Sequence, residues 1–344
     1  MKLIDCDSHY LPYNVYANVQ EEFKKYLPTY KWDQQGNLVS VDMDLDPVTV
    51  PGNHWPITSF GNELGLSNIE HRVNDFEKLG ISKQLLTSQE LAMRFNYSVD
   101  PQLATEMCRS FNVEVNKVIA QHPTKFFGSA LLPMQSAKGC IDELRWAVNN
   151  NFKSVYIDTR FVDSNGCRPI TTLKWFGEFL EECQATNTVV YFHPMMHIAP
   201  IFGDAYDQIK DFLPSEFHVC IYGLLASGYL DKLPNLQMVF AEGADSFAVG
   251  ILKFSEIIKS RNPAVVKRPP IEYFKQNFSF VIDSEHKNTV MNLVRELGSE
   301  RLLFGTDYPH LGDPVGRNMW NDSADFNNLN LTHTDLENIA YKNG

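Results

Sequence analysis

The chain has 344 residues, 44% of them hydrophobic, which is enough for a large buried core. Its formal net charge of −12, with no cluster of Lys or Arg, argues against nucleic acids and anionic membranes as partners. The six Cys residues are scattered without CxxC pairs, and the sequence has no signal-peptide pattern and no apolar run of membrane-spanning length. We therefore expect a cytoplasmic protein that acts on a small molecule.

Eight short runs of aliphatic, β-branched and aromatic residues follow one another and are predicted to be strands. They are residues 3–6, 83–87, 126–132, 154–157, 188–192, 237–241, 278–282 and 302–305. Helical patterns lie between them, for example at 103–121, 140–149, 172–186, 246–259 and 287–297. Strands that alternate with helices pair in parallel, and eight such repeats close on themselves. The sequence thus predicts an α/β fold, a (β/α)₈ TIM barrel.

Three long segments follow predicted strands and should lie over the C-terminal face of the barrel. They are an insert at about residues 10–70 and the loops 194–230 and 308–328. An open doubly wound sheet is the alternative fold, but the glycine-rich turn typical of it does not follow the first strand. We expect one domain over residues 1–344, with a last helix opened by a capping box at Thr334 to Glu337.

Side chains that can bind a metal follow four of the predicted strands. They are Asp7 and His9 after the first strand, His193 after the fifth, Glu242 after the sixth and Asp307 after the eighth. Because side chains alternate along a strand, Asp5 should share a face with Asp7 and His9, whereas Cys6 should point the other way. A buried histidine, a helix N-cap or an ion pair explains each residue singly. A metal site at the C-terminal rim explains all of them together.

Five segments carry a further pattern, namely residues 4–9, 131–135, 191–194, 227–236 and 304–310. Together they resemble the amidohydrolase superfamily, and within it the amidohydrolase-related branch that includes aminocarboxymuconate-semialdehyde decarboxylase and γ-resorcylate decarboxylase. The first and last of these segments are the most specific. The resemblance covers nearly the whole chain and implies the metal-dependent hydrolase type of TIM barrel, commonly found as a homodimer.

By position, the resemblance implies that Asp7, His9, His193 and Asp307 bind one divalent metal ion per chain. Mixed nitrogen and oxygen ligands suit Zn²⁺, which we expect first, and also Mn²⁺ or Fe²⁺. The resemblance further implies that the metal polarises the substrate or lowers the pKa of bound water, while Asp307 shuttles a proton.

One position departs from the decarboxylases of this branch. They typically have a histidine at the end of the sixth strand, where this chain has Glu242, and Asp245 stands where several of them have a glutamate. An ionised Glu242 cannot donate a hydrogen bond to a developing oxyanion. It would also make a divalent metal with two aspartate ligands net negative, so the site would repel a carboxylate substrate unless a cation compensates or Glu242 is protonated.

Arg160, just past the fourth strand, is the best placed compensating cation. Its planar guanidinium could bind a substrate carboxylate through two hydrogen bonds, although an ion pair with an acidic residue such as Asp158 explains it equally well. Asp245 and His310 are further candidates for contact with the substrate.

The charge balance at Glu242 favours hydrolysis of an amide or cyclic amide C–N bond by a metal-bound hydroxide. Asp307 would act as base and then acid, and Glu242 would orient the reactants or act as an auxiliary base. The alternative is a metal-dependent, non-oxidative decarboxylation of an aromatic or enoic acid, with Arg160 binding the carboxylate. A non-catalytic barrel that keeps its metal for structure is the weakest of the three interpretations, because none of the four expected ligands is missing.

Overall fold

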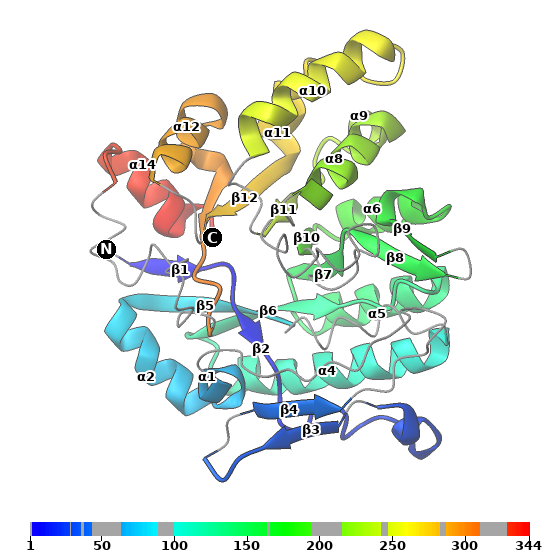
Figure 1. Ribbon diagram of the computed structural model, residues 1–344, viewed down its shortest axis with the longest axis vertical. Helices are drawn as coiled ribbons and strands as arrows, with labels where there is room; N and C mark the ends of the chain where they lie inside the picture. The colour runs from blue at the N-terminus through cyan, green and yellow to red at the C-terminus, as the bar shows by residue number, and fades with distance from the viewer. Residues whose placement is uncertain are drawn as a thin grey trace.

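Eight parallel strands, one from each predicted run, lie side by side in the computed structural model (Figure 1). The structure describes residues 2–27, 29–35, 38–42, 63–88, 100–163, 166–193, 215–241, 247–282, 287–309 and 329–344. In pairing order the strands are β1 (Leu3–Asp5), β5 (Ile81–Ser88), β6 (Phe126–Leu131), β7 (Ser154–Asp158), β10 (Val189–His193), β11 (Met238–Phe240), β12 (Phe278–Ile282) and β13 (Leu302–Phe304). Their boundaries differ from the predicted ones by at most two residues, so the predicted strands are confirmed.

The barrel closes between its first and last strands. The backbone N–H of Cys6 donates to the carbonyl of Phe304 at 2.8 Å, and the N–H of His9 donates to the carbonyl of Tyr308 at 2.7 Å. Ser8 and Tyr308 also form a parallel β-bridge. The predicted (β/α)₈ TIM barrel is therefore confirmed, and the residues that follow β1 and β13 meet at its C-terminal rim.

Helices surround the barrel (Figure 1). They are α1 (Glu63–Ser67), α2 (Ile69–Leu79), α4 (Pro101–Gln121), α5 (Ala137–Asn149), α6 (Phe176–Ala185), α8 (Ser215–Ser227), α9 (Tyr229–Lys232), α10 (Phe247–Arg261), α11 (Pro270–Asn277), α12 (Lys287–Leu297) and α14 (His333–Glu337), with the 3₁₀ turns η1 (Glu21–Tyr26), η3 (Ile170–Thr172) and η6 (Ser299–Arg301) and the π-helical turn η8 (Asn338–Lys342). None of the described helices is long and apolar enough to cross a membrane.

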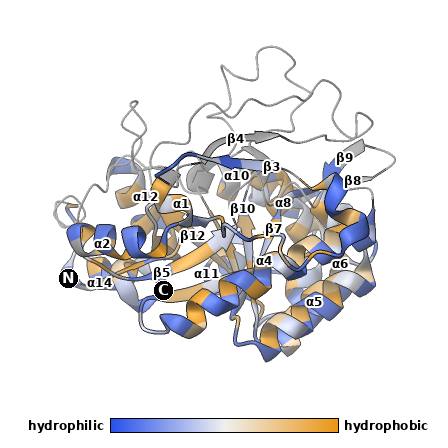
Figure 2. Cartoon of the chain, turned by 90° about the horizontal axis from the view of Figure 1, so that it is seen from below, coloured by the Kyte–Doolittle hydropathy of each residue, from blue (hydrophilic) through white to orange (hydrophobic). Residues whose placement is uncertain are grey.

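The helices bury one face and expose the other. On α5 the buried residues follow helical spacing, at Cys140, Glu143, Leu144 and Ala147. Blue and orange alternate along α4, α5 and α6 in Figure 2, as expected for helices that lie between the barrel and solvent. Hydrophobic periodicity at a repeat of 3.6 residues is therefore what made these helices predictable from the sequence.

Two antiparallel hairpins and one helix interrupt the simple repeat. The predicted insert at residues 10–70 contains the hairpin of β3 (Thr29–Trp32) and β4 (Leu38–Asp42), while β2 (His9–Tyr10) pairs with β5 at its start. A second hairpin, β8 (Arg160–Asp163) and β9 (Gly166–Pro169), follows β7. The expectation that 194–230 is all loop is wrong, because residues from 215 onward form α8. Its residues Phe217, Cys220, Ile221 and Leu224 have helical spacing and are fully buried.

The last helix begins two residues earlier than its predicted capping box. Thr332 is the N-cap: its side chain accepts from the backbone N–H of Asp335, whose carboxylate accepts from the backbone N–H of Thr332. The predicted box at Thr334 to Glu337 is therefore wrong. Both threonines have an acidic residue three positions later, and only the tertiary position of the chain selects between them.

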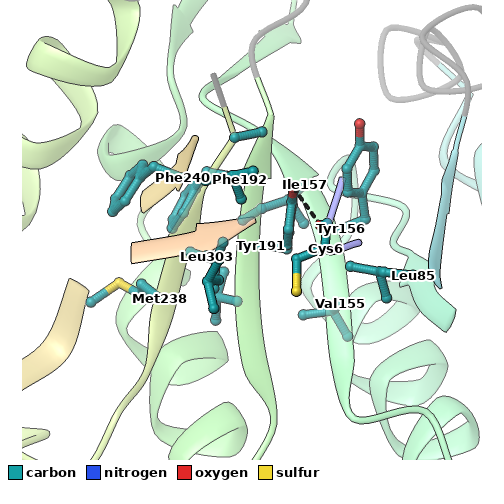
Figure 3. Packing of buried hydrophobic residues seen from close by; sticks show 14 of the residues in the cluster. Cys6, Leu85, Val155, Tyr156, Ile157, Tyr191, Phe192, Met238, Phe240 and Leu303 are labelled. Atoms are coloured by element: carbon teal, nitrogen blue, oxygen red, sulfur yellow. Dashed lines mark hydrogen bonds between the residues drawn. The ribbon is translucent and has the colours of Figure 1, made fainter. Parts of the chain in front are cut away.

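Aromatic, aliphatic and sulfur-containing side chains pack together in the core (Figure 3). The hydroxyl of Tyr191 on β10 reaches across to the carbonyl of Cys6, 3.0 Å away, and its ring stacks on that of Tyr156. The next residue, Phe192, points the other way and stacks on Phe240, which packs against Phe217 of α8. This alternation fixes which side chains of β10 face the barrel axis, and His193, two residues after Tyr191, shares the inner face.

Candidate metal centre

Three buried side chains with metal-binding atoms come together at the C-terminal rim. Asp7, His9 and His193 each offer one such atom, and these atoms lie within 4.8 Å of one another. The exposed fractions of the three residues are 0, 1 and 0%. Among the described residues, the cluster includes neither Asp5 nor Cys6. Asp5, which was expected to share a face with Asp7, instead accepts hydrogen bonds within the barrel wall.

Hydrogen bonding orients the ring of His9. Its Nδ1 lies 3.1 Å from the carbonyl of Ser88, at the end of β5. A carbonyl only accepts, so Nδ1 carries the proton and Nε2 is left to face the cluster. The rings of His9 and His193 meet edge to face, with centroids 5.0 Å apart. This tautomer is the one in which Nε2 can bind a metal, as in many histidine-metal sites.

Asp307 approaches the same cluster from the segment after β13. Its Oδ1 lies 2.9 Å from Nε2 of His9, and its backbone N–H donates to the carbonyl of Asp7 at 3.1 Å. Its φ of 53° is a left-handed conformation, which is strained for most residues and less so for aspartate. Its side chain is 24% exposed, so Asp307 forms the open side of an otherwise buried cluster.

Two tyrosines form the floor of the cluster inside the barrel. Burial raises the pKa of Tyr191 well above its usual value, and the negative charge of Asp7 adds to the rise. The ring of Tyr156 lies 5.5 Å from that of His193. Tyr191 therefore lies against Asp7 and Tyr156 against His193, and Asp307 lies on the side of the cluster that is open to solvent.

Asp5 is bound into the barrel wall. Its Oδ2 accepts hydrogen bonds from the side chains of Gln84 at 2.5 Å and Thr306 at 2.6 Å, and its Oδ1 accepts from the backbone N–H groups of Thr306 at 3.0 Å and Asp7 at 3.1 Å. Burial raises the pKa of Asp5 to about 6, and these hydrogen bonds, which favour the carboxylate, oppose the rise. Asp5 thus links β1 to β5 and to the segment that carries Asp307.

Arg160 follows the end of β7 and lies beside a buried acid. Asp158 ends β7 directly opposite His193 in the strand register, and its carboxylate accepts from the backbone N–H of Arg160 at 3.2 Å. Burial raises the pKa of Asp158 to about 6, and the positive charge of Arg160 lowers it in opposition. Arg160 thus lies beside Asp158, the acidic residue with which an ordinary ion pair was considered as the alternative to substrate binding.

Three predicted site residues, Glu242, Asp245 and His310, lie outside the described residues. A further residue, Arg72 of α2, was missed by the sequence reasoning. It is fully buried, and its guanidinium donates to Ser8 and to the carbonyl of His9. Burial lowers its pKa to about 10, so it stays positively charged at neutral pH. The available signal was its spacing: Arg72 lies four residues before the buried Phe76, on the apolar face of the helix.

The donor set fits a divalent transition metal. Two imidazoles and two carboxylates from Asp7, His9, His193 and Asp307 give mixed nitrogen and oxygen ligands of the kind that binds Zn²⁺, Mn²⁺ or Fe²⁺. The ring of His9 is already in the required tautomer, and its orienting carbonyl is the second-layer contact that metal-binding histidines usually make.

Comparisons with known proteins agree with this arrangement. A family model described as Amidohydrolase matches residues 4–343. The chain is 25% identical over 308 residues to γ-resorcylate decarboxylase of Polaromonas sp. strain JS666, which covers 86% of this chain and 90% of that relative. It is also 25% identical over 255 residues to 2-amino-3-carboxymuconate-6-semialdehyde decarboxylase of Dictyostelium discoideum, covering 71% of this chain and 67% of the relative.

A solved structure has the same fold. The dihydroxybenzoic acid decarboxylase of Polaromonas sp. JS666, with bound manganese and the inhibitor 2-nitroresorcinol, superposes with a TM-score of 0.72. Its sequence identity is 21%, and the match covers 99% of this chain and 95% of that one. The metal and the inhibitor belong to that protein, and the likeness confirms the barrel.

These similarities correct the expected reaction. Hydrolysis of a C–N bond, favoured by the charge count at Glu242, is wrong as the main interpretation, because the relatives are decarboxylases. The count included the charges of Asp7, Asp307 and Glu242, and it left open a compensating cation or a protonated Glu242. Asp158, which the count left out, is a further buried acid at the end of β7: burial raises its pKa to about 6, and the charge of Arg160 opposes the rise, so the charge of the rim depends on more than the counted residues.

Proposed function

The chain belongs to the amidohydrolase family, and from this premise we propose that it is a metal-dependent carboxy-lyase that releases CO₂ from a small aromatic or enoic acid without oxidation. The observation that carries the proposal is the 308-residue similarity to γ-resorcylate decarboxylase, which spans 90% of that enzyme. The cluster of Asp7, His9 and His193 at the rim supports it, since this is where TIM-barrel enzymes have their active sites.

We assign Asp7, His9, His193 and Asp307 as ligands of one divalent ion per chain. Zn²⁺ and Mn²⁺ both suit the donor set, and the manganese of the Polaromonas structure brings Mn²⁺ forward as the ion to test beside Zn²⁺. When bound, the ion would supply positive charge beside the oxygen atoms of the substrate. The homodimer expected from the resemblance stays a prediction, which light scattering of the purified protein tests.

In a non-oxidative decarboxylation the bond between carbon and carboxylate breaks, CO₂ leaves, and a proton replaces it on the same carbon. We assign the proton transfer to Asp307. It is the one member of the cluster with a partly exposed side chain, at 24%, so its carboxyl group can exchange protons with solvent and deliver one to the substrate carbon. The tyrosine floor closes the site from below and keeps water away from the buried ligands.

Arg160 is proposed to bind the substrate carboxylate. It follows β7, and β7 places Asp158 opposite His193, so the segment that carries Arg160 starts at the edge of the cluster. A guanidinium pairs with a carboxylate through two parallel hydrogen bonds and keeps its charge at any relevant pH. Replacing Arg160 with methionine should therefore raise KM more than it lowers kcat.

The test measures CO₂ release from hydroxybenzoic acids and an enoic acid, and ammonia or amine release from matched amides. Wild type, Asp307→Asn and Asp142→Asn are compared, each with its metal content from elemental analysis. Asp142 lies on α5 and pairs with Lys138 in an exposed ion pair, so its variant controls for the loss of a carboxylate. We expect CO₂ from wild type and Asp142→Asn and at least a hundredfold loss in Asp307→Asn. Amine release without CO₂ would refute the proposal.

A further inference from the structure

Arg72 contacts two of the three segments that supply the proposed ligands, the one with Asp7 and His9 and the one with Asp307. It belongs to α2, which precedes β5, and its side chain is completely buried. A buried guanidinium is strongly unfavourable unless its N–H groups find acceptors and its charge is compensated. The hydrogen-bond acceptors of Arg72 therefore show which segments of the chain its side chain positions.

The first partners are at the end of β1, around the ligands Asp7 and His9. Nη1 of Arg72 donates to Oγ of Ser8 at 3.1 Å, and Nη2 donates to the carbonyl of His9. Ser8 is fixed in turn, because its hydroxyl donates to the carbonyl of Leu85 on β5 at 2.6 Å. The guanidinium thus contacts the side chain of Ser8, which lies between Asp7 and His9, and the backbone carbonyl of His9.

The second set of partners leads to Asp307. Nη1 of Arg72 also donates to Oε1 of Gln84 at 2.5 Å, and Nε2 of Gln84 donates to Asp5. The same oxygen of Asp5, Oδ2, also accepts from the hydroxyl of Thr306, and Oδ1 accepts from the backbone N–H of Thr306, which directly precedes Asp307. A buried positive and a buried negative charge are joined through one amide, and the chain of hydrogen bonds connects residues 301 positions apart in sequence.

A third contact holds the residue after Asp307. The guanidinium of Arg72 lies over the ring of Tyr308, 4.7 Å from its centroid, and the hydroxyl of Tyr308 donates to Asp75 at 2.9 Å. On the other side α1 comes so close that a Cβ on Gly65 would lie 2.2 Å from the Tyr308 hydroxyl. Thr306 and Tyr308, the two neighbours of Asp307, are therefore both connected to Arg72: Thr306 through Asp5 and Gln84, and Tyr308 through its ring.

We propose that Arg72 is a positioning residue, which sets the spacing between the Asp7–His9 segment and Asp307 through Ser8, the His9 carbonyl, the Gln84–Asp5–Thr306 relay and Tyr308. The inference rests on the proposed metal site. A guanidinium suits this role because its planar fork donates in several fixed directions at once, whereas a lysine ammonium on a flexible stem does not. Contacts of this kind around metal ligands typically change metal affinity by ten- to a hundredfold.

The first test compares the Mn²⁺ affinity of metal-free wild type and Arg72→Lys, followed by the EPR signal of free Mn²⁺. We expect the Kd of the variant to be at least tenfold higher, and its CO₂ release to recover in excess Mn²⁺. Arg109→Lys is the matched control. Arg109 also makes two hydrogen bonds to a buried acid, Glu143, and stacks on Trp146, but it lies on α4 and not at the cluster. Its variant should bind Mn²⁺ as wild type does.

A second pair of variants decides the point if Arg72→Lys does not fold. Thr306→Val keeps the shape of the side chain and removes the hydroxyl that Asp5 accepts, whereas Thr306→Ser keeps the hydroxyl and removes the methyl group. If the relay positions Asp307, Thr306→Val should bind Mn²⁺ about tenfold more weakly and Thr306→Ser as tightly as wild type. A purely structural role of the side chain predicts equal Mn²⁺ affinity for both variants.

Equal Kd values in wild type and Arg72→Lys, or in Thr306→Val and Thr306→Ser, overturn the inference. A wild type that binds Mn²⁺ but releases no CO₂ from any acid overturns the proposed function alone, and the Kd comparison still decides the role of Arg72. A wild type that binds neither Mn²⁺ nor Zn²⁺ overturns both.

Discussion

Replacing Asp158 with asparagine should remove a pH dependence of folding that this buried carboxyl group creates. Asp158 is 1% exposed, and burial raises its pKa from 3.8 to about 6 in the folded protein. At about 1.4 kcal/mol per pKa unit, this corresponds to about 3 kcal/mol. Because the pKa is raised on folding, the stabilisation is complete below pH 3.8 and is lost as the pH rises through 6.

The free energy of unfolding of wild type should therefore fall by about 2–3 kcal/mol relative to Asp158→Asn between roughly pH 4 and pH 8. Asparagine keeps an oxygen that can accept from Thr159 and from the backbone of Arg160, so the comparison isolates the charge. Urea unfolding of chelator-treated protein measures it, since a nearby divalent ion would itself favour the carboxylate.

The control is Asp142→Asn. The hydrogen bond from Lys138 lowers the pKa of the exposed Asp142, so its effect on stability is confined to more acidic solution. If wild type and Asp158→Asn have parallel profiles between pH 4 and pH 8, burial does not raise the pKa of Asp158, and the reasoning is refuted.

Three further outcomes are expected. Adding Mn²⁺ at a hundred times its Kd should stabilise the metal-free protein by about 2.7 kcal/mol, and no shift of the melting curve would contradict the metal site. Glu143→Ala should reduce stability by about 3 kcal/mol, because it leaves Arg109 and Asn112 without their buried acceptor, and should leave Mn²⁺ affinity unchanged in the same EPR titration. Gly65→Ala should lower stability by about 1–3 kcal/mol in urea unfolding, since its methyl group would clash with Tyr308, and should also weaken Mn²⁺ binding; a change in stability alone would show that Tyr308 does not position Asp307.

The strands and helices could be predicted because their signals are local. Buried strands such as β13 are continuous apolar runs, and helices such as α5 repeat buried residues every three or four positions. The C-terminal ends of parallel strands share one rim, so the polar residues after β1, β10 and β13 could be placed near one another once the barrel was inferred. Boundaries set by tertiary packing, as at Thr332 and in α8, were the ones missed.

The reaction was mispredicted because the net charge of the active-site rim depends on how its acidic and basic side chains are buried and paired. Whether a carboxyl group is ionised depends on its surroundings: the pKa of Asp158, for example, depends on its burial and on the positive charge of Arg160 beside it. The sequence contains both residues but does not show how deeply either is buried.

The sequence by itself determined the barrel and the candidate ligands, because periodicity and strand ends are encoded within a few residues. Only the tertiary structure decided how those ligands are held. The relay from Arg72 through Gln84 and Asp5 to Thr306 joins one helix, two strands of the barrel and the segment after β13, and no local pattern links a buried arginine on α2 to an aspartate after β13. Hydrogen bonds between distant segments depend on directions and distances that exist only after the chain has folded.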